Sequence, residues 1–279
     1  MSTVEPGLWL VATPIGNLGD MPPRAVEVLR AAGTVLCEDT RHSGKLFSHF
    51  GISGARLVVA NEHTEHDAAS AMLDALADGQ VVAVVTDAGT PGVSDPGERL
   101  VRAALAAGHA VHAVPGPAAF VMAATLSGLP TDRIAFDGFL PRSGAERRVA
   151  LTEAARERRT TVLYEAPHRL VRTVEDLRTA CGGGRRVAIA RELTKMHETV
   201  WRGTLDDAVA HVTSEEPRGE YVIVLEPAPV ADHEVSDATI AEELRARVAA
   251  GLSKRDAVNE VTVALGVPRS RVYAESLKL

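Results

Sequence analysis

Short runs of apolar, often β-branched residues alternate with helical patterns along most of the chain, and this alternation constrains the fold more than any other feature. Near-continuous apolar runs are typical of strands buried on both faces, as in a parallel sheet. Five of them occupy residues 8–13, 34–37, 56–60, 81–86 and 110–114. Strands that alternate with helices predict β-α-β units, and therefore an α/β architecture with helices over a sheet.

A second α/β series follows Pro115-Gly116-Pro117. Its candidate strands are 134–139, 160–165, 186–191 and 220–225, and its candidate helices are 145–158, 167–180 and 205–213. A proline-spaced segment at 226–232 has the composition of a linker. We therefore expect an N-terminal α/β domain over 1–117, a C-terminal α/β domain over 118–227 and a tail over 237–279.

The tail has no strand pattern and is predicted to form three short helices. The first covers about 239–250 and ends at Gly251, and Ser253 can cap the second. Gly266 is a turn before the third helix. Two helices joined by a glycine turn form a helix-turn-helix pattern. The alternative is a small helical bundle with a purely structural role.

The charge is unevenly distributed along the 279 residues, whose formal net charge is −7. Residues 1–117 hold 7 basic and 13 acidic residues, a net of −6, whereas residues 131–191 hold 13 and 8, a net of +5. The basic residues of this stretch are arginines, which suit bidentate contacts with phosphate. The arginine-rich stretch can therefore meet RNA, or it can be a solvated helix face. Aromatic residues are only 4% of the chain, which disfavours recognition built on base stacking.

Three loops rich in glycine and proline follow predicted strands, at 13–20, 86–97 and 115–119. Open α/β sheets bind ligands where the strands end, and glycine lets a backbone approach a ligand closely. The first loop is not GxGxxG, so a dinucleotide site is not predicted there. Asp95 stands before Pro96 and is expected to cap a helix that runs to Gly108.

These loops belong to a longer set of motifs in order along residues 8–226. The set comprises Ala12-Thr-Pro-Ile-Gly-Asn-Leu-Gly-Asp20, Glu38-Asp-Thr-Arg41, Thr86-Asp-Ala-Gly-Thr-Pro-Gly-Val-Ser-Asp-Pro-Gly97, Pro115-Gly-Pro117, Ser127-Gly-Leu-Pro130, Phe139-Leu-Pro141, Glu165-Ala-Pro-His-Arg169, Arg191-Glu-Leu-Thr-Lys195 and Arg202-Gly203. With them the chain resembles the tetrapyrrole-methylase superfamily. Within that superfamily it resembles the bacterial 16S rRNA (cytidine-2′-O)-methyltransferase family.

The resemblance implies two α/β domains of tetrapyrrole-methylase type with S-adenosylmethionine in the cleft between them, and a homodimer. It implies methyl transfer to the ribose 2′-hydroxyl of a decoding-centre cytidine in 16S rRNA, as free RNA or in the small ribosomal subunit. The cofactor contacts that it implies are Pro14, Ile15, Gly89, Thr90, Val93, Ala118, Ala119 and Tyr164. For Ala118 and Ala119 the alternative is a tight helix start.

The chemistry needs a ribose hydroxyl aligned with an activated methyl group, and a nearby base would assist. Carboxylates at predicted strand ends or loops can act as this base. We expect Glu192, Lys195 and Glu38 to be catalytic. Arg41, Arg142, Arg169 and Arg191 are expected to bind RNA. Alternatively, each carboxylate only pairs with a neighbouring arginine.

Two other functions fit parts of the pattern. One is a methyltransferase acting on a porphyrinoid, and the other is a ligand sensor whose tail binds nucleic acid. No metal is expected. Two cysteines are too few for a disulfide framework, no apolar stretch is long enough to span a membrane, and the start of the chain lacks an early basic region. We therefore expect a cytoplasmic protein.

Overall fold

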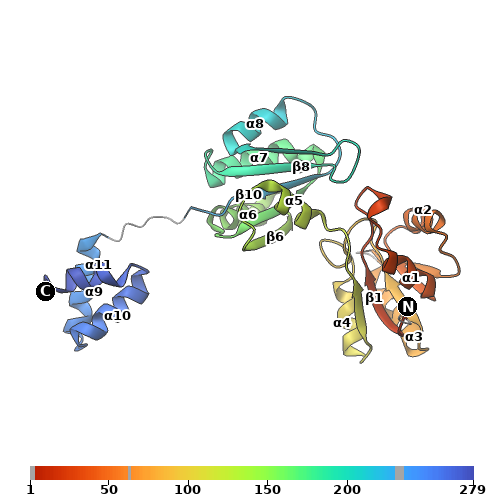
Figure 1. Cartoon of the computed structure of the whole chain (residues 1–279), viewed down its shortest axis with the longest axis horizontal. Helices are drawn as coiled ribbons and strands as arrows, with labels where there is room; N and C mark the ends of the chain where they lie inside the picture. Colours follow the sequence, from red (N-terminus) through yellow and green to blue (C-terminus); the bar gives the residue numbers. More distant parts are fainter. Residues whose placement is uncertain (1–3, 62–63, 230–235) are drawn as a thin grey trace. The chain divides into compact units, whose positions relative to one another are not determined.

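The computed structural model describes residues 4–61, 64–229 and 236–279. The chain divides into two compact units, residues 1–228 and 229–279, and each is described by itself. The first unit contains two five-stranded sheets, and the second contains three helices (Figure 1). The predicted linker at 226–232 extends beyond the described residues.

The first sheet is parallel throughout, in the order β3-β2-β4-β1-β5. Its strands are β1 (Gly7–Val11), β2 (Thr34–Cys37), β3 (Arg56–Val59), β4 (Val81–Val84) and β5 (Val111–Val114). Each coincides with one of the five predicted runs. The three glycine-rich loops therefore follow β1, β4 and β5, which are neighbours in the sheet.

Helices cover both faces of this sheet, which explains why its strands are apolar on both sides. Along β1, Trp9 and Val11 pack into one apolar core and Leu8 packs into the other. The helices on the Val11 face are α1 (Pro23–Ala31) and α2 (Thr40–Phe50). Those on the Leu8 face are α3 (Glu65–Ala77) and α4 (Glu98–Ala106).

The second sheet is mixed, in the order β6-β7-β10-β8-β9. Its strands are β6 (Ile134–Phe139), β7 (Thr160–Glu165), β8 (Arg186–Arg191), β9 (Thr199–Thr204) and β10 (Tyr221–Leu225). Only β6 and β7 are parallel; β10 runs antiparallel to β7 and β8, and β9 antiparallel to β8. Strand β9 was not predicted, because it is an edge strand whose residues are exposed or half-buried and show no apolar run.

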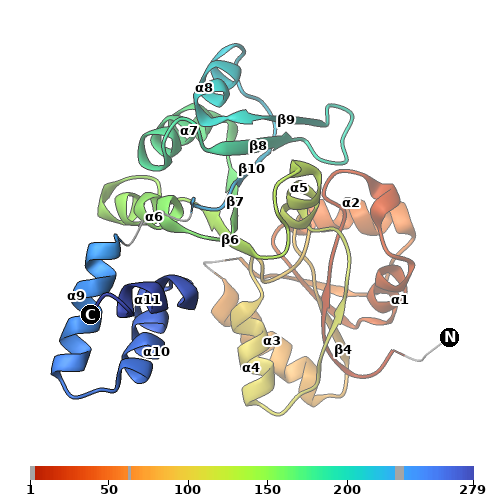
Figure 2. The same ribbon diagram turned by 60° about the vertical axis from the view of Figure 1, so that its left-hand side comes forward.

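The second sheet is also covered on both faces. Helix α5 (Ala119–Ser127) packs on the face that carries Val162 and Val222. Leu163 and Ile223 point to the opposite face, together with α6, α7 and α8. These three helices are α6 (Gly144–Arg156), α7 (Pro167–Cys181) and α8 (Leu205–Thr213), and Figure 2 shows α7 and α8 beside β8 and β9.

The second unit consists of α9 (Asp237–Ala249), α10 (Lys254–Leu265) and α11 (Arg269–Ser276) around a small apolar core. Two predicted signals are confirmed: the Ser253 side chain accepts from the Asp256 amide at the start of α10, and Gly266 ends α10 with φ +62°. The three predicted tail helices are therefore present. In the part of the chain that is described, no helix is both long and apolar enough to cross a membrane.

Candidate active site

The three loops that follow β1, β4 and β5 are tied to one another. Thr13 and Gly89 exchange two backbone hydrogen bonds of 2.8 and 3.1 Å, and the Thr13 hydroxyl donates to the Thr86 carbonyl. The Thr90 hydroxyl donates to the Pro117 carbonyl at 3.1 Å. The loops predicted to bind a ligand thus form one connected rim at the carboxyl ends of the strands.

The second loop folds back on itself before α4. The Gly92 amide donates to the Pro96 carbonyl, and Gly97 has φ +144°; a Cβ there would lie 2.9 Å from the Gly92 nitrogen. Gly97 is therefore the N-cap, and α4 begins at Glu98 without a side-chain cap. The expectation that Asp95 caps this helix is wrong, because the tight turn at Gly97 separates Asp95 from the helix start and its side chain lines a cavity instead.

This cavity has a volume of about 300 Å³ and receives residues from both α/β halves of the first unit. It is lined by Ile15, Ala88, Gly89, Thr90, Val93, Ser94, Asp95, Ala118, Ala119, Phe120, Phe139, Tyr164, Glu165, Ala166, Pro167, Leu193, Glu220, Tyr221 and Val222. Concave sites with mainly apolar walls and a few polar groups are typical of small-molecule binding.

Seven of the eight predicted cofactor contacts line this cavity, and within the described residues Pro14 does not. Ala118 and Ala119 line it and also form the start of α5, so the predicted helix start is present and both residues lie at the cavity wall. They bring the N-terminus of a helix and small side chains to the wall, which leaves room for a ligand.

Tyr164 is fixed within the cavity by its hydroxyl and its ring. The hydroxyl accepts from the Phe120 amide at 3.2 Å, and the ring meets those of Phe136 and Phe139 edge-on at 4.9 and 5.6 Å. Burial raises the pKa of Tyr164, so it stays a neutral phenol. An aromatic wall of this kind suits a flat or cationic ligand.

Three carboxyl groups of the first α/β half influence one another, and one of them, Asp95, lines the cavity. Glu38 accepts from the Asp87 amide at 3.1 Å, and one buried oxygen of Asp87 has no hydrogen-bond partner among the described residues. Desolvation, followed by the charges of Glu38 and Asp87, raises the pKa of Asp95 to about 7. Desolvation also raises the pKa of Glu38. This region therefore favours a cation or a proton.

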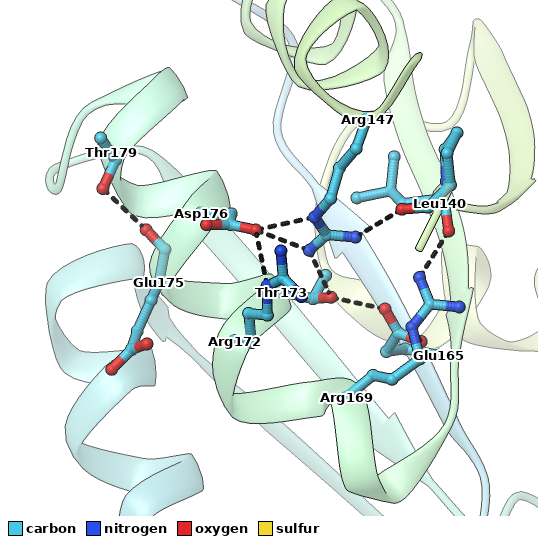
Figure 3. Close-up of polar contacts among 10 residues, drawn as sticks. Leu140, Arg147, Glu165, Arg169, Arg172, Thr173, Glu175, Asp176 and Thr179 are labelled. Carbon is cyan, nitrogen blue, oxygen red and sulfur yellow. Dashed lines mark hydrogen bonds and ion pairs between the residues drawn. The ribbon is translucent and has the colours of Figure 1, made fainter. Parts of the chain in front are cut away.

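Glu165 closes the cavity from the second sheet as part of a buried network (Figure 3). Its side chain is 0% exposed, accepts from the Thr173 hydroxyl at 2.5 Å and pairs with Arg169 at 3.3 Å. Arg147 in turn donates to the Thr173 hydroxyl and pairs with Asp176. A buried carboxylate of this kind is tolerated only because each charge has partners.

The same network holds the segment after β6. Arg169 donates to the Leu140 carbonyl at 2.5 Å, and Arg147 donates to the Pro141 carbonyl at 3.0 Å. Arg147 is only 4% exposed, so it does not belong to an RNA-binding surface. Arg185 is also buried and donates to backbone carbonyls. Part of the predicted arginine-rich surface is therefore internal structure.

Glu192, Lys195 and Glu220 form a charged cluster at the edge of the cavity, which Glu220 and Leu193 line. Lys195 Nζ lies 2.9 Å from Glu192 and 2.8 Å from Glu220. Partial burial raises the pKa of Glu192, but hydrogen bonds from Lys195 and the Glu220 backbone outweigh it, and the pKa lies below its usual value. Glu192 has φ +51°, and such backbone strain is common at functional sites.

Lys195 also reaches the first loop. A Cβ built at Gly16 would lie 2.3 Å from Lys195 Cγ, so the lysine stem passes directly over this glycine. Hydrogen bonds to Glu220 and Glu192 raise the pKa of Lys195 despite its partial burial. A fully charged lysine is thus held between the β8–β9 segment and the loop after β1.

The residues predicted to bind RNA differ in their exposure and in their partners. Arg41 is exposed and pairs with Asp39 at 2.8 Å, and Arg142 is exposed just before α6. Arg191 is half-buried and donates to the Arg218 carbonyl at 2.9 Å. Arg169 is engaged with Glu165 and Leu140, as described above.

Several residues that line the cavity are absent from the site predicted from the sequence, and Asp95 and Phe139 are the two that matter most for its chemistry. The sequence predicts a capping role for Asp95 and places Phe139 only within a motif. Their positions in the sequence could have indicated a place in the site, since Asp95 lies in a glycine-rich loop after one strand and Phe139 ends another strand. In the described ranges, no group of three or more His, Cys, Asp or Glu side chains is placed to hold a metal ion.

Comparison with known proteins identifies the family. Residues 7–209 match the family of Tetrapyrrole (Corrin/Porphyrin) Methylases. A relative from Synechocystis sp., named Ribosomal RNA small subunit methyltransferase I, is 45% identical over 273 residues, or 98% of each chain. The chain therefore belongs to the tetrapyrrole methylase family, and within it to the branch whose members carry that name.

Solved structures show the same fold. The methyltransferase CobJ has a TM-score of 0.61 at 22% identity, with 80% of this chain and 94% of CobJ covered. Uroporphyrin-III C-methyltransferase from Thermus thermophilus, in complex with S-adenosyl homocysteine, has a TM-score of 0.56 at 21% identity, with 79% of this chain and 97% of that chain covered. The predicted fold class and the predicted methyl donor both agree with this family.

Proposed function

We propose that the chain is an S-adenosylmethionine-dependent methyltransferase that methylates the ribose 2′-hydroxyl of a decoding-centre cytidine in 16S rRNA. The observation that carries the proposal is the cavity in which seven of the eight predicted cofactor contacts meet. The names of relatives that are 40–45% identical support ribosomal RNA as the substrate class. The ribose 2′-position and the cytidine come from the resemblance described above.

The cavity has the chemistry that this cofactor requires. Ile15, Val93 and Leu193 offer apolar surface to an adenine ring, and a volume of about 300 Å³ is within the usual range for small ligands. The Asp95 carboxyl group and the Tyr164 ring favour a positively charged group. When bound, S-adenosylmethionine supplies a methyl group that is already activated by a sulfonium charge.

The protein then has to position the ribose hydroxyl and accept its proton. Alignment of the reacting groups can lower the barrier by about 7–11 kcal/mol. Glu192, Lys195 and Glu38 remain candidate catalytic residues, but Glu192 and Lys195 pair with each other and Glu38 holds the Asp87 amide.

Asp95 is the better-placed proton acceptor. It lines the cavity and has no hydrogen bond or ion pair with another described residue, and its pKa of about 7 suits proton transfer at neutral pH. We therefore assign the proton-accepting role to the Asp95 carboxylate. The role that we propose for the Glu192–Lys195 pair is to orient the RNA backbone at the edge of the cavity.

The partners and location follow the same proposal. We propose the small ribosomal subunit or free 16S rRNA as the substrate, a homodimer as the assembly and the cytoplasm as the compartment. Light scattering of the purified protein tests the dimer.

Transfer of labelled methyl groups tests the reaction. The full chain is incubated with labelled S-adenosylmethionine and with 16S rRNA, assembled small subunits or a porphyrinoid. Label in the RNA at a ribose, located by nuclease digestion, supports the proposal. Label in the porphyrinoid supports the alternative suggested by the solved structures of the same fold, and tight binding without transfer supports a ligand sensor.

A further inference from the structure

A second cavity lies beside the first and belongs to the second sheet and α6. We call it the β6 pocket; its volume is about 780 Å³. It is lined by Asp137, Phe139, Leu140, Pro141, Ala150, Glu153, Arg156, Glu157, Arg158 and Arg159. Phe139 also lines the first cavity, so the two cavities share a wall.

A β-bulge near the end of β6 sets the direction of this wall. The register shifts between Phe136 and Gly138, which leaves Asp137 without a partner on β7. Gly138 has φ +62°, and a Cβ there would lie 2.8 Å from the Ser94 hydroxyl. Bulges next to active sites commonly redirect a side chain. Here the bulge places the end of β6 against the loop after β4 and turns Phe139 outward.

The Phe139 ring is exposed although it is large and apolar. It is 52% exposed, and it touches the Tyr164 ring edge-on at 5.6 Å. The following residues are held by Arg169 and Arg147, which donate to the Leu140 and Pro141 carbonyls. A fixed, exposed aromatic ring beside a cavity is a surface on which a nucleobase can stack.

The charged side chains around the β6 pocket include both acidic and basic groups. Asp137, Glu157 and Arg159 line the same pocket. Burial and the charge of Glu157 raise the pKa of Asp137, and the charge of Arg159 opposes this shift. Arg159 pairs with Glu157 at 2.6 Å. Arg158 has no ion pair with another described residue. The pocket therefore offers carboxylate acceptors beside guanidinium donors, which fits the polar edge of a base better than a phosphate.

We propose that the β6 pocket takes an extruded cytosine base, stacked on Phe139, with its exocyclic amine donating to Asp137 and its carbonyl oxygen accepting from Arg158 or Arg159. This inference rests on the proposed function and names the part of the substrate that the pocket reads. A carboxylate that accepts from the cytosine amine discriminates against uracil, which carries a carbonyl at that position. Because Phe139 lines both cavities, a base in the β6 pocket directs its ribose toward the first cavity.

Two RNA substrates that differ in one base test the proposal. The ribose methylated by the wild-type protein is mapped, and 16S rRNA is then transcribed with cytidine or uridine at that position. We expect Asp137→Asn to lower kcat/KM for the cytidine RNA by about tenfold or more, and to reduce the preference for cytidine over uridine. Asp132→Asn, at an exposed position before the same strand, is the matched control and should leave both values unchanged.

The stacking contact is tested separately at Phe139. Phe139→Leu keeps an apolar side chain but removes the aromatic face, and should lower kcat/KM for the RNA by about tenfold. Phe139→Trp should restore it. S-adenosylmethionine affinity, measured by calorimetry, should stay at the wild-type value in Asp137→Asn.

The outcomes separate the two proposals. If the wild-type protein methylates neither RNA, the proposed function fails. If it methylates the cytidine RNA but Asp137→Asn keeps the full preference for cytidine, the contact with the base edge is overturned. If Phe139→Leu matches the wild type, the stacking contact is overturned.

Discussion

Replacing Asp95 by Asn should make the fold more stable and methyl transfer much slower. The folded-state pKa of about 7 lies roughly 3 units above the ordinary 3.8, which at 1.36 kcal/mol per unit corresponds to about 4 kcal/mol at high pH. Asp95 is only partly buried, so we discount this for solvent and expect about 1–2 kcal/mol. Because the pKa is raised, the charged carboxylate opposes folding, and this cost increases as pH rises from about 4 to 7.

The predicted change in stability is measured by urea unfolding of the wild-type protein and Asp95→Asn at pH 5 and pH 8. The variant should be more stable at pH 8, by about 1–2 kcal/mol, and the difference should be smaller at pH 5. The exposed Asp132→Asn again serves as control. Equal stability at pH 8, or a less stable variant, would refute the view that Asp95 is held in an unfavourable, partly desolvated place.

The predicted loss of activity is measured by the rate of methyl transfer in a single turnover. The wild-type rate should rise with pH up to about 7 and then level off, since only the carboxylate accepts a proton. Asp95→Asn should lose about 10²-fold or more at pH 8. A variant that is stabilised but keeps the wild-type rate would show that the raised pKa has no catalytic purpose.

Four further predictions follow from other parts of the site. Gly97→Ala forces a side chain into positive φ, 2.9 Å from a neighbouring backbone nitrogen; it should cost about 1–3 kcal/mol in urea unfolding and weaken cofactor binding in calorimetry. Thr173→Val removes a hydroxyl that both donates and accepts in the buried network and should lower the unfolding free energy by about 1–3 kcal/mol. Glu192→Gln and Lys195→Ala should each lower RNA methylation, and normal turnover in both would exclude a catalytic role. RNA affinity should fall with salt by about 0.7–0.9 log units per contacted phosphate per log unit of salt, and Arg142→Ala should reduce that slope in filter binding.

Much of the secondary structure follows from the sequence because burial on both faces of a sheet leaves a strong apolar pattern. The runs that became β2 and β4, for example, are almost entirely buried. Strand β9 left no such pattern, since it lies at the edge of the second sheet and carries Thr, Arg and Gly. Strand direction was also beyond the sequence: β10 is as apolar as a parallel strand, yet it runs antiparallel to both neighbours.

Most of the residues predicted to contact the cofactor line the first cavity because they lie within short loops at the ends of neighbouring strands. Ile15, Gly89 and Ala118 each belong to a local motif, and the parallel strands bring these motifs to one edge. The roles of the charged residues were harder to predict, because the sequence does not show whether an arginine or a carboxylate is exposed or paired. Arg147 lies inside the protein because Asp176 and Thr173, one helix further along, provide its partners.

The sequence by itself determined the α/β pattern, the three loops at strand ends, the helical tail and the family, because each depends on local spacing or on motifs. Only the tertiary structure decided which polar groups are satisfied. It placed Asp95 at the wall of a cavity instead of at a helix cap, without an ion pair to any residue that the structure describes, and it placed Phe139 on the wall between two pockets. Burial, pKa and pairing depend on residues distant in the chain, and these are brought together only when the sheets, helices and loops pack.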